Sequence, residues 1–159
     1  MLTIIRNYDL EDVKRGMNYL LDKASQSEEV RQLAVNIIDN KPDSIAAIYD
    51  WVRDNVRYTP DPILIELLTS PVRMVNDYLQ GKPLAEDCDG IAILITALCR
   101  SIGIQSSVVL LDTKGEGLDH AISQVHSDIG WVSVDASDSI HPLGWSISYY
   151  NSYYNKVIV

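Results

Sequence analysis

Apolar residues recur at every third or fourth position along much of the first half of the chain, a spacing that predicts amphipathic helices. Four such stretches follow one another, over residues 10–24, 28–38, 44–56 and 71–80. Ser27 is a suitable N-cap for the second helix because two glutamates follow it in the first turn. Asp43 or Ser44 is expected to start the third. Pro71 opens the fourth, and Gly81 lies just past its end.

The segment at residues 88–103, CDGIAILITALCRSIG, is apolar on nearly every side. A helix without a polar face has to be surrounded by protein, so this segment is predicted to be a central, buried helix. The pattern then changes to short β-branched or alternating runs, which are typical of strands, at residues 104–111, 121–125 and 131–134. Helices followed by strands predict an α+β fold in which an antiparallel sheet packs on the central helix.

The length and composition fit a single domain over residues 1–159. The chain is 47% hydrophobic, and a chain of this size buries roughly two-thirds of its unfolded surface. We expect a core over about 45–145, preceded by helices within 1–40. The Tyr-rich C-terminal segment, 146–159, is interpreted as a terminal strand or hairpin.

The charge of the chain argues against two classes of partner. Thirteen Lys and Arg oppose 22 Asp and Glu, which gives a net charge of -9, and no run of basic residues is present to neutralise phosphates. We therefore expect no nucleic-acid or membrane partner. The first residues lack the apolar stretch of a secretory signal, and no segment approaches the ~18 apolar residues of a membrane span. These features predict a cytoplasmic protein.

The two cysteines, Cys88 and Cys99, fall in the same predicted helix. Eleven residues at about 1.5 Å each separate them by about 16 Å, which is beyond the reach of a disulfide. Each sulfur therefore needs its own explanation. Cys99 lies deep in the apolar segment and is interpreted as a core residue.

Cys88 stands at the start of the buried helix, where it is placed for chemistry. Unpaired N–H groups and the helix dipole at that end stabilise a thiolate and can bind a developing oxyanion. Asp87 and Asp89 flank the sulfur, however, and their charges raise a thiol pKa. A thiolate would need a nearby cation, and His120 is the candidate.

The predicted hairpin of residues 121–134 indicates how His120 acquires an acidic partner. A turn within residues 127–130 pairs positions whose numbers sum to about 257, so Asp135 becomes the diagonal neighbour of His120 on the same face. A slip of two residues would place Asp135 directly opposite His120, and a slip of one would separate them onto opposite faces. His126 shares that face but lies roughly 20 Å along the strand, beside the turn.

Three sequence segments resemble the motifs of the transglutaminase-like superfamily, which is related to papain. They are DCDGIAILITALCRSIGI, DHAISQV and GWVSVDAS, in this order along the chain. The upstream segment AAIYDWVRDNVRYTPDP resembles the helix and Tyr-bearing loop that precede the Cys motif in many members, and the PDP, ELLTSP and HPLGW segments are most similar to versions carried by phages and prophages. The chain departs from many relatives at Glu86, where they have Gly, and at Ala121-Ile122-Ser123.

The resemblance implies that Cys88, His120 and Asp135 form a catalytic triad. Cys88 would attack the carbonyl of an amide or ester in a peptide or protein, His120 would hold the thiolate and then protonate the leaving group, and Asp135 would orient the imidazole. No cofactor and no metal are implied. A phage-encoded member would also be expected in the virion.

Four further residues are candidates for the substrate cleft. The backbone N–H of Cys88 is the expected first oxyanion donor, and Tyr58 or Asn55 is proposed as the second. Asp87 borders the sulfur, and Trp131 is a candidate for shaping the cleft.

Simpler interpretations compete with each of these assignments. Taken alone, Cys88 is more often a small buried hydrophobic residue, and His120 a residue on the surface of a strand. The same three residues offer ligands for zinc, although no paired motif supports it. The rival to an enzyme is a non-catalytic module, such as a phage structural or assembly component, that binds a peptide on the same fold. His141 has no partner that the sequence identifies.

Overall fold

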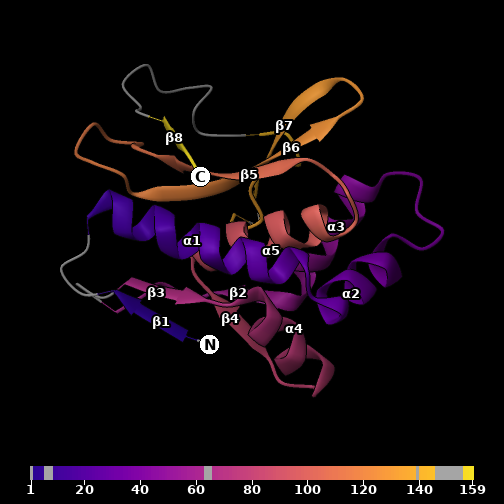
Figure 1. Cartoon of the computed structure of the whole chain (residues 1–159). Helices are drawn as coiled ribbons and strands as arrows, with labels where there is room; N and C mark the ends of the chain where they lie inside the picture. Colours follow the sequence, from indigo (N-terminus) through magenta and orange to yellow (C-terminus); the bar gives the residue numbers. More distant parts are fainter. Residues whose placement is uncertain (1, 6–8, 63–65, 139, 146–155) are drawn as a thin grey trace.

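The helix predicted to be buried lies at the centre of the structure, a computed structural model that describes residues 2–5, 9–62, 66–138, 140–145 and 156–159 (Figure 1). The helices of this part of the chain are α1 (Leu10–Ser25), α2 (Glu28–Ile38), α3 (Ser44–Asn55), α4 (Pro71–Leu79) and the central α5 (Cys88–Ser101). Each begins at the residue predicted from the sequence. Helix α3 ends one residue early because Val56 leaves the helix and starts a strand.

The predicted antiparallel sheet is present and packs on α5. It consists of β5 (Ser106–Leu111), β6 (His120–Ser127), β7 (Gly130–Val134) and β8 (Lys156–Ile158), in the order β7-β6-β5-β8. Figure 1 shows this sheet above α5, so the α+β prediction is confirmed. Strand β8 comes from the Tyr-rich segment, of which residues 146–155 lie outside the described part of the chain.

Two small sheets were not predicted. Strand β1 (Leu2–Ile5) pairs antiparallel with β3 (Glu66–Thr69), and β2 (Val56–Tyr58) pairs parallel with β4 (Leu84–Glu86). Figure 1 shows them on the side of α5 opposite the large sheet. Strands of three or four residues are too short to establish an alternating pattern, which is why the expectation of helices followed by strands missed them.

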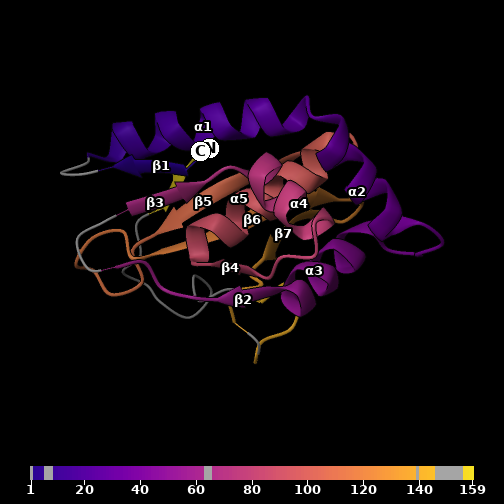
Figure 2. The same cartoon turned by 90° about the horizontal axis from the view of Figure 1, so that it is seen from below.

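Burial of α5 on all sides organises the core. Seen from below in Figure 2, α1 runs along one side of α5 and α3 along the other, while the large sheet covers a further face. Within the helix, Ile93, Leu94, Ile95 and Leu98 have no exposed surface. Each such side chain stabilises the fold by about 1.5–3 kcal/mol relative to full exposure. Among the described helices, none combines the length and apolar character that a membrane span requires.

A buried polar contact fixes the position of β6 on α5. The hydroxyls of Thr96 and Ser123 lie 2.9 Å apart, and the Ser123 hydroxyl donates to the carbonyl of Ala92 at 2.8 Å. Thr96 and Ser123 are both fully buried, so these hydrogen bonds satisfy groups that would otherwise destabilise the core. They set the register between the helix that carries Cys88 and the strand that begins at His120.

The first turn of α5 packs tightly against Glu86. Asp87 is the N-cap and accepts a hydrogen bond from the N–H of Gly90 at 3.1 Å. A Cβ atom at Gly90 would lie 2.5 Å from Oε2 and 2.9 Å from Cβ of Glu86. The close approach to a Cβ atom cannot be relieved by rotating the side chain, so glycine is required there as long as Glu86 is present.

We expect Gly90→Ala to destabilise the protein by about 1–3 kcal/mol, because it overpacks the contact with Glu86. In an unobstructed helix the same change stabilises by up to about 1 kcal/mol. The double variant Glu86→Gly/Gly90→Ala removes the obstructing atoms and should recover most of the loss. Urea unfolding of Gly90→Ala, Glu86→Gly and the double variant measures this coupling, and equal effects of Gly90→Ala with and without Glu86 would contradict it.

Burial raises the pKa of Glu86 to about 7, although a hydrogen bond from Thr69 has the opposite effect. Since the folded-state pKa lies above the unfolded value of 4.5, the contribution of Glu86 to stability is most favourable below pH 4.5 and is lost as the pH rises through about 7. Glu86→Gln should therefore stabilise the protein at pH 8 and change it little at pH 5. Urea unfolding at both pH values tests this, with the exposed Glu116→Gln as the control expected to show no such difference.

Candidate active site

Cys88 is the first residue of α5, and its sulfur contacts both the helix and the large sheet. The backbone N–H of Ala121, on β6, lies close enough to the sulfur to favour its thiolate form. The thiol in turn lies 3.7 Å from Oδ1 of Asp89. The backbone N–H of Cys88 belongs to the first turn of the helix, where N–H groups have no partner within the helix. Both cysteines are free thiols, and Cys99 is fully buried.

His120 and Asp135 meet as predicted from the hairpin register. Strands β6 and β7 pair Ser127 with Gly130, and the position numbers sum to 257 along the ladder. Asp135 follows the end of β7 and is the diagonal neighbour of His120. Nε2 of His120 lies 2.7 Å from Oδ2 of Asp135.

Asp135 is held in place by the residues that follow it. Its Oδ1 accepts hydrogen bonds from the backbone N–H of Ser137 at 3.0 Å and from the Ser137 hydroxyl at 2.6 Å. The carboxylate is 8% exposed. With Oδ1 occupied in this way, Oδ2 is directed to His120, and the imidazole is fixed by a preorganised carboxylate.

A cavity of about 460 Å³ brings Cys88 and His120 to one surface. Its walls come from the start of α1, the start of α5, strand β5 and the segment that enters β6. The lining residues are Leu10, Val13, Asp87, Cys88, Asp89, Leu110, Leu118, Asp119 and His120. Cys88 and His120, which are 32 positions apart in the sequence, therefore line the same cavity.

The pKa of the Cys88 thiol is raised above its ordinary value. Burial is the largest cause, and the charges of Asp89 and Asp87 add to it, while the N–H of Ala121 acts in the opposite direction. An ion-paired thiolate would require a lowered pKa. The thiol of Cys88 is therefore protonated near neutral pH when nothing is bound beside it.

The pKa of His120 is also raised. Burial lowers it, but the hydrogen bond to Asp135 and the charge of that carboxylate favour the imidazolium and have the larger combined effect. Asp119 and Asp138 add to the same shift. The charges around the imidazole are thus predominantly negative.

Tyr58 lies close to the site, as its electrostatics show. Burial raises the pKa of its hydroxyl, and the nearby charges of Cys88 and Asp87 raise it further. Tyr58 pairs with Glu86 through the parallel strands β2 and β4, which places it beside the start of α5. The amide of Asn55 instead donates to the carbonyl of Trp51 in its own helix at 2.8 Å. Of the two proposed second oxyanion donors, Tyr58 is the one that this geometry favours.

The structure does not bring Trp131 to the Cys88 cavity. Trp131 pairs with His126 near the turn of the β6–β7 hairpin, and the two rings make an edge contact at 5.3 Å. Both line a separate cavity of about 770 Å³ that also contacts the start of α3. Because Trp131 precedes Asp135 by four positions, about 13 Å of extended strand separates it from the triad. The structure therefore places Trp131 at a different cavity from Cys88, and a role for Trp131 in shaping the substrate cleft stays a prediction.

The loop after β7 supplies groups that the sequence did not identify. His141 contacts Asp138 through Nδ1 and stacks on Trp145 with ring centroids 3.5 Å apart. Its carbonyl accepts a hydrogen bond from the hydroxyl of Tyr49 at 2.8 Å, which ties the loop to α3. These partners lie in a segment without regular periodicity, so only tertiary contacts reveal them.

The zinc interpretation does not match the observed grouping. In the described residues, the side chains close enough to share an ion are three consecutive ones, Asp87, Cys88 and Asp89, with ligand atoms within 4.8 Å of one another. Asp87 already caps α5 through Gly90. His120 presents Nε2 to Asp135, whereas the thiol of Cys88 contacts Asp89, so the predicted set of Cys88, His120 and Asp135 is not grouped around one point.

Two solved structures share this fold at low sequence identity. One is described as a candidate cysteine protease from Cytophaga hutchinsonii, with a TM-score of 0.55 and 19% identity, and the match covers 99% of this chain and 60% of that chain. The other is described as a candidate protease from Parabacteroides distasonis, with a TM-score of 0.56, 18% identity, and coverage of 80% of this chain and 27% of that chain. The chain thus spans less than two-thirds of either protein.

A family model provides the more specific match. No curated protein matches the chain, and the resemblance to phage and prophage members stays a prediction. The model of the transglutaminase-like superfamily matches residues 29–136, which begin in α2 and end just after Asp135. This range exceeds half of the sequence and contains Cys88, His120 and Asp135, so the chain belongs to the transglutaminase-like superfamily.

Proposed function

We propose that this protein is a cysteine-nucleophile hydrolase or acyltransferase that acts on an amide bond of a peptide or protein. The observation that carries the proposal is the 2.7 Å contact between His120 and Asp135 at the edge of the cavity that also contains Cys88. Family membership supports the same class of chemistry.

In the proposed first step, His120 acts as a general base. Asp135 accepts a hydrogen bond from Nε2–H and thereby fixes the tautomer in which Nδ1 is the proton acceptor. Because the Cys88 thiol is protonated at rest, its proton would pass to Nδ1 as the sulfur attacks the carbonyl carbon. The C–S bond forms while the π electrons of the carbonyl move to its oxygen, which becomes the oxyanion.

In the second step the imidazolium returns that proton to the leaving amine, and the C–N bond breaks to give a thioester on Cys88. Water would then release an acid, and an amine would instead release a new amide. The two outcomes share the same residues, which is why the proposal covers both hydrolase and acyltransferase.

The oxyanion would be stabilised by two donors. The backbone N–H of Cys88 stands in the first turn of α5, where the helix dipole also favours negative charge. The hydroxyl of Tyr58 is the proposed second donor, because its raised pKa keeps the proton in place. Loss of one oxyanion donor typically costs about 10²–10³ in rate.

A non-catalytic peptide-binding module is the second candidate function. The raised pKa of Cys88 favours it, since a thiol that is protonated at rest is a poor nucleophile unless a base assists it. The two candidates differ in whether His120 makes Cys88 reactive toward an acyl group.

We expect the p-nitrophenyl ester of Nα-acetyl-norleucine to acylate Cys88, detected as a mass increase on the peptide that carries it. Cys88→Ala should abolish the adduct, and His120→Ala should slow its formation roughly 10²–10⁴-fold. Cys99→Ala removes the other thiol, which is fully buried, and should leave the adduct unchanged. An adduct that forms equally fast without His120 would favour the non-catalytic module.

The acylation rate should rise with pH as His120 loses its proton, with a midpoint above 6.5 because the pKa of His120 is raised. Asp135→Asn removes the charge that raises this pKa, so the midpoint should move to lower pH. The maximal rate should also fall, by roughly 10²-fold or more, because the amide does not fix the required tautomer. Stopped-flow release of nitrophenol between pH 5 and 9 measures both effects, and an unchanged midpoint in the variant would exclude His120 as the titrating base.

A further inference from the structure

The cavity beside Cys88 is lined by two chemically different sets of residues, which we name the aliphatic wall and the acidic wall. One is aliphatic and is formed by Leu10, Val13, Leu110 and Leu118. Leu10 and Leu118 are 37% and 39% exposed, which is high for leucine and places apolar surface at the mouth of the cavity. The other wall carries the carboxylates of Asp87, Asp89 and Asp119.

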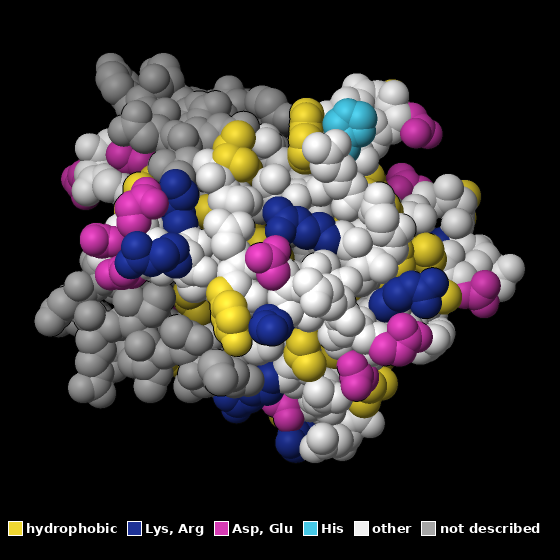
Figure 3. Space-filling view, in the orientation of Figure 1, with side chains coloured by type: hydrophobic (Ala, Val, Ile, Leu, Met, Phe, Trp, Pro, Cys, Tyr) yellow, Lys and Arg dark blue, Asp and Glu magenta, His cyan; other side chains and the backbone are white. Residues whose placement is uncertain are grey.

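The acidic character of this cavity is local. Among the described residues that line it, none is Lys or Arg. The face drawn in Figure 3, by contrast, carries basic and acidic side chains next to one another. Lys114 approaches Asp119 at 3.4 Å from outside the cavity, but its side chain is 71% exposed, so this ion pair is weak and can be exchanged.

We propose that the site selects an acyl substrate whose side chain has an aliphatic stem and a cationic end, as lysine and arginine do. This inference rests on the proposed function and names the substrate class for it. The stem would lie along the leucines and the valine, and the charged end would reach the carboxylates. Long basic side chains bury their methylene groups while the charge stays among polar groups, which is the division that the two walls provide.

The same arrangement links binding to activation of the nucleophile. Asp89 and Asp87 are among the causes that hold the Cys88 thiol protonated. A bound cation would offset their charges and favour the thiolate. A neutral substrate fills the aliphatic wall without this effect, and an acidic substrate would be repelled.

The test compares the p-nitrophenyl esters of Nα-acetyl-lysine, Nα-acetyl-norleucine and Nα-acetyl-glutamate. Lysine and norleucine share a four-carbon stem and differ in the ammonium group. We expect the acylation rate constant of Cys88 to be about tenfold higher for the lysine ester than for the norleucine ester at low salt, and lowest for the glutamate ester. The ratio of lysine to norleucine should fall as salt is added.

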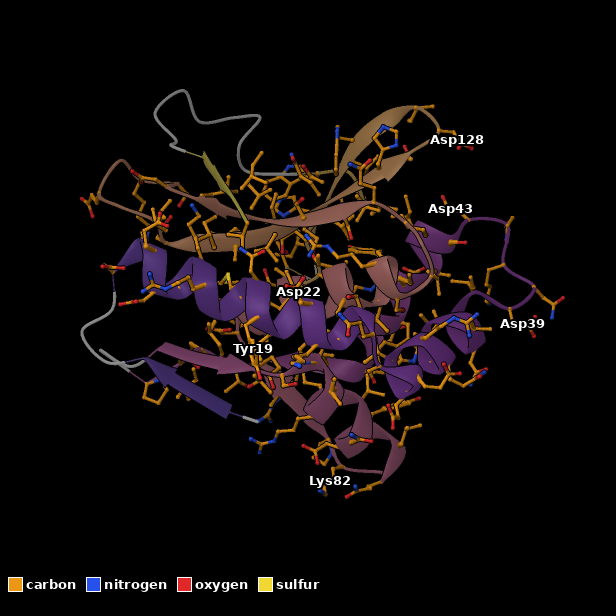
Figure 4. All side chains as sticks on the ribbon, viewed as in Figure 1. Tyr19, Asp22, Asp39, Asp43, Lys82 and Asp128 are labelled. Atoms are coloured by element: carbon orange, nitrogen blue, oxygen red, sulfur yellow. The ribbon has the colours of Figure 1, made fainter. Side chains whose placement is uncertain are left out.

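Variants separate the two walls. Asp119→Asn should reduce the ratio of lysine to norleucine several-fold. The carboxylate also accepts hydrogen bonds from the N–H and the hydroxyl of Thr113, both at 2.7 Å, and the amide oxygen of Asn can keep one of them. Asp89→Asn should reduce the ratio as well. Leu118→Ser should slow the lysine and norleucine esters together and leave their ratio unchanged. Asp128→Asn is the matched control, because it removes one negative charge at the far hairpin labelled in Figure 4 and should leave the ratio unchanged.

The possible results separate the proposed substrate class from the proposed function on which it rests. If no ester acylates Cys88, the proposed function fails. If the norleucine ester acylates Cys88 with dependence on His120, but the lysine and glutamate esters react at equal rates, the function stands and the cationic specificity is wrong. If Asp128→Asn lowers the ratio as much as Asp119→Asn, the selectivity comes from net charge and not from this cavity, which also overturns the inference.

Discussion

Burial of α5 is the constraint on which the rest of the structure depends. The helix has no polar face over most of its length, so α1, α3 and the large sheet must all pack around it, and their positions follow from that requirement. Its first turn is the exception, because the N–H groups there need partners other than the helix. The candidate nucleophile, Cys88, stands at this boundary between the apolar core and the cavity that His120 also lines.

The contact between α5 and β6 transmits this constraint to the site. Thr96 and Ser123 form a hydrogen bond within the core that aligns β6 on α5. The N–H of Ala121, on the same strand, lies near the sulfur of Cys88. The antiparallel register of β6 and β7 then delivers Asp135 to His120. Three segments that are distant in sequence thus converge through one helix-to-sheet interface.

The charges around the site do not favour the thiolate that a cysteine nucleophile requires. Negative charges surround both Cys88 and His120, and they oppose the thiolate while they favour the imidazolium. Such charges disfavour attack by the sulfur unless a base or a bound cation compensates them. The proposed general-base role of His120 and the proposed cationic substrate both follow from these negative charges.

The sequence by itself determined the helix starts, the central buried helix and the main strands, because periodicity is a local property. It also offered the register that makes Asp135 the diagonal neighbour of His120, and the structure selected that register from the alternatives. Tertiary structure alone decided the small sheets that involve β1 to β4, the distance of Trp131 from Cys88, the packing of Glu86 on Gly90 and the direction of the pKa shift at Cys88. Each of these depends on which surfaces exclude water and which charges meet across segments remote in the chain, and no local pattern of residues encodes that information.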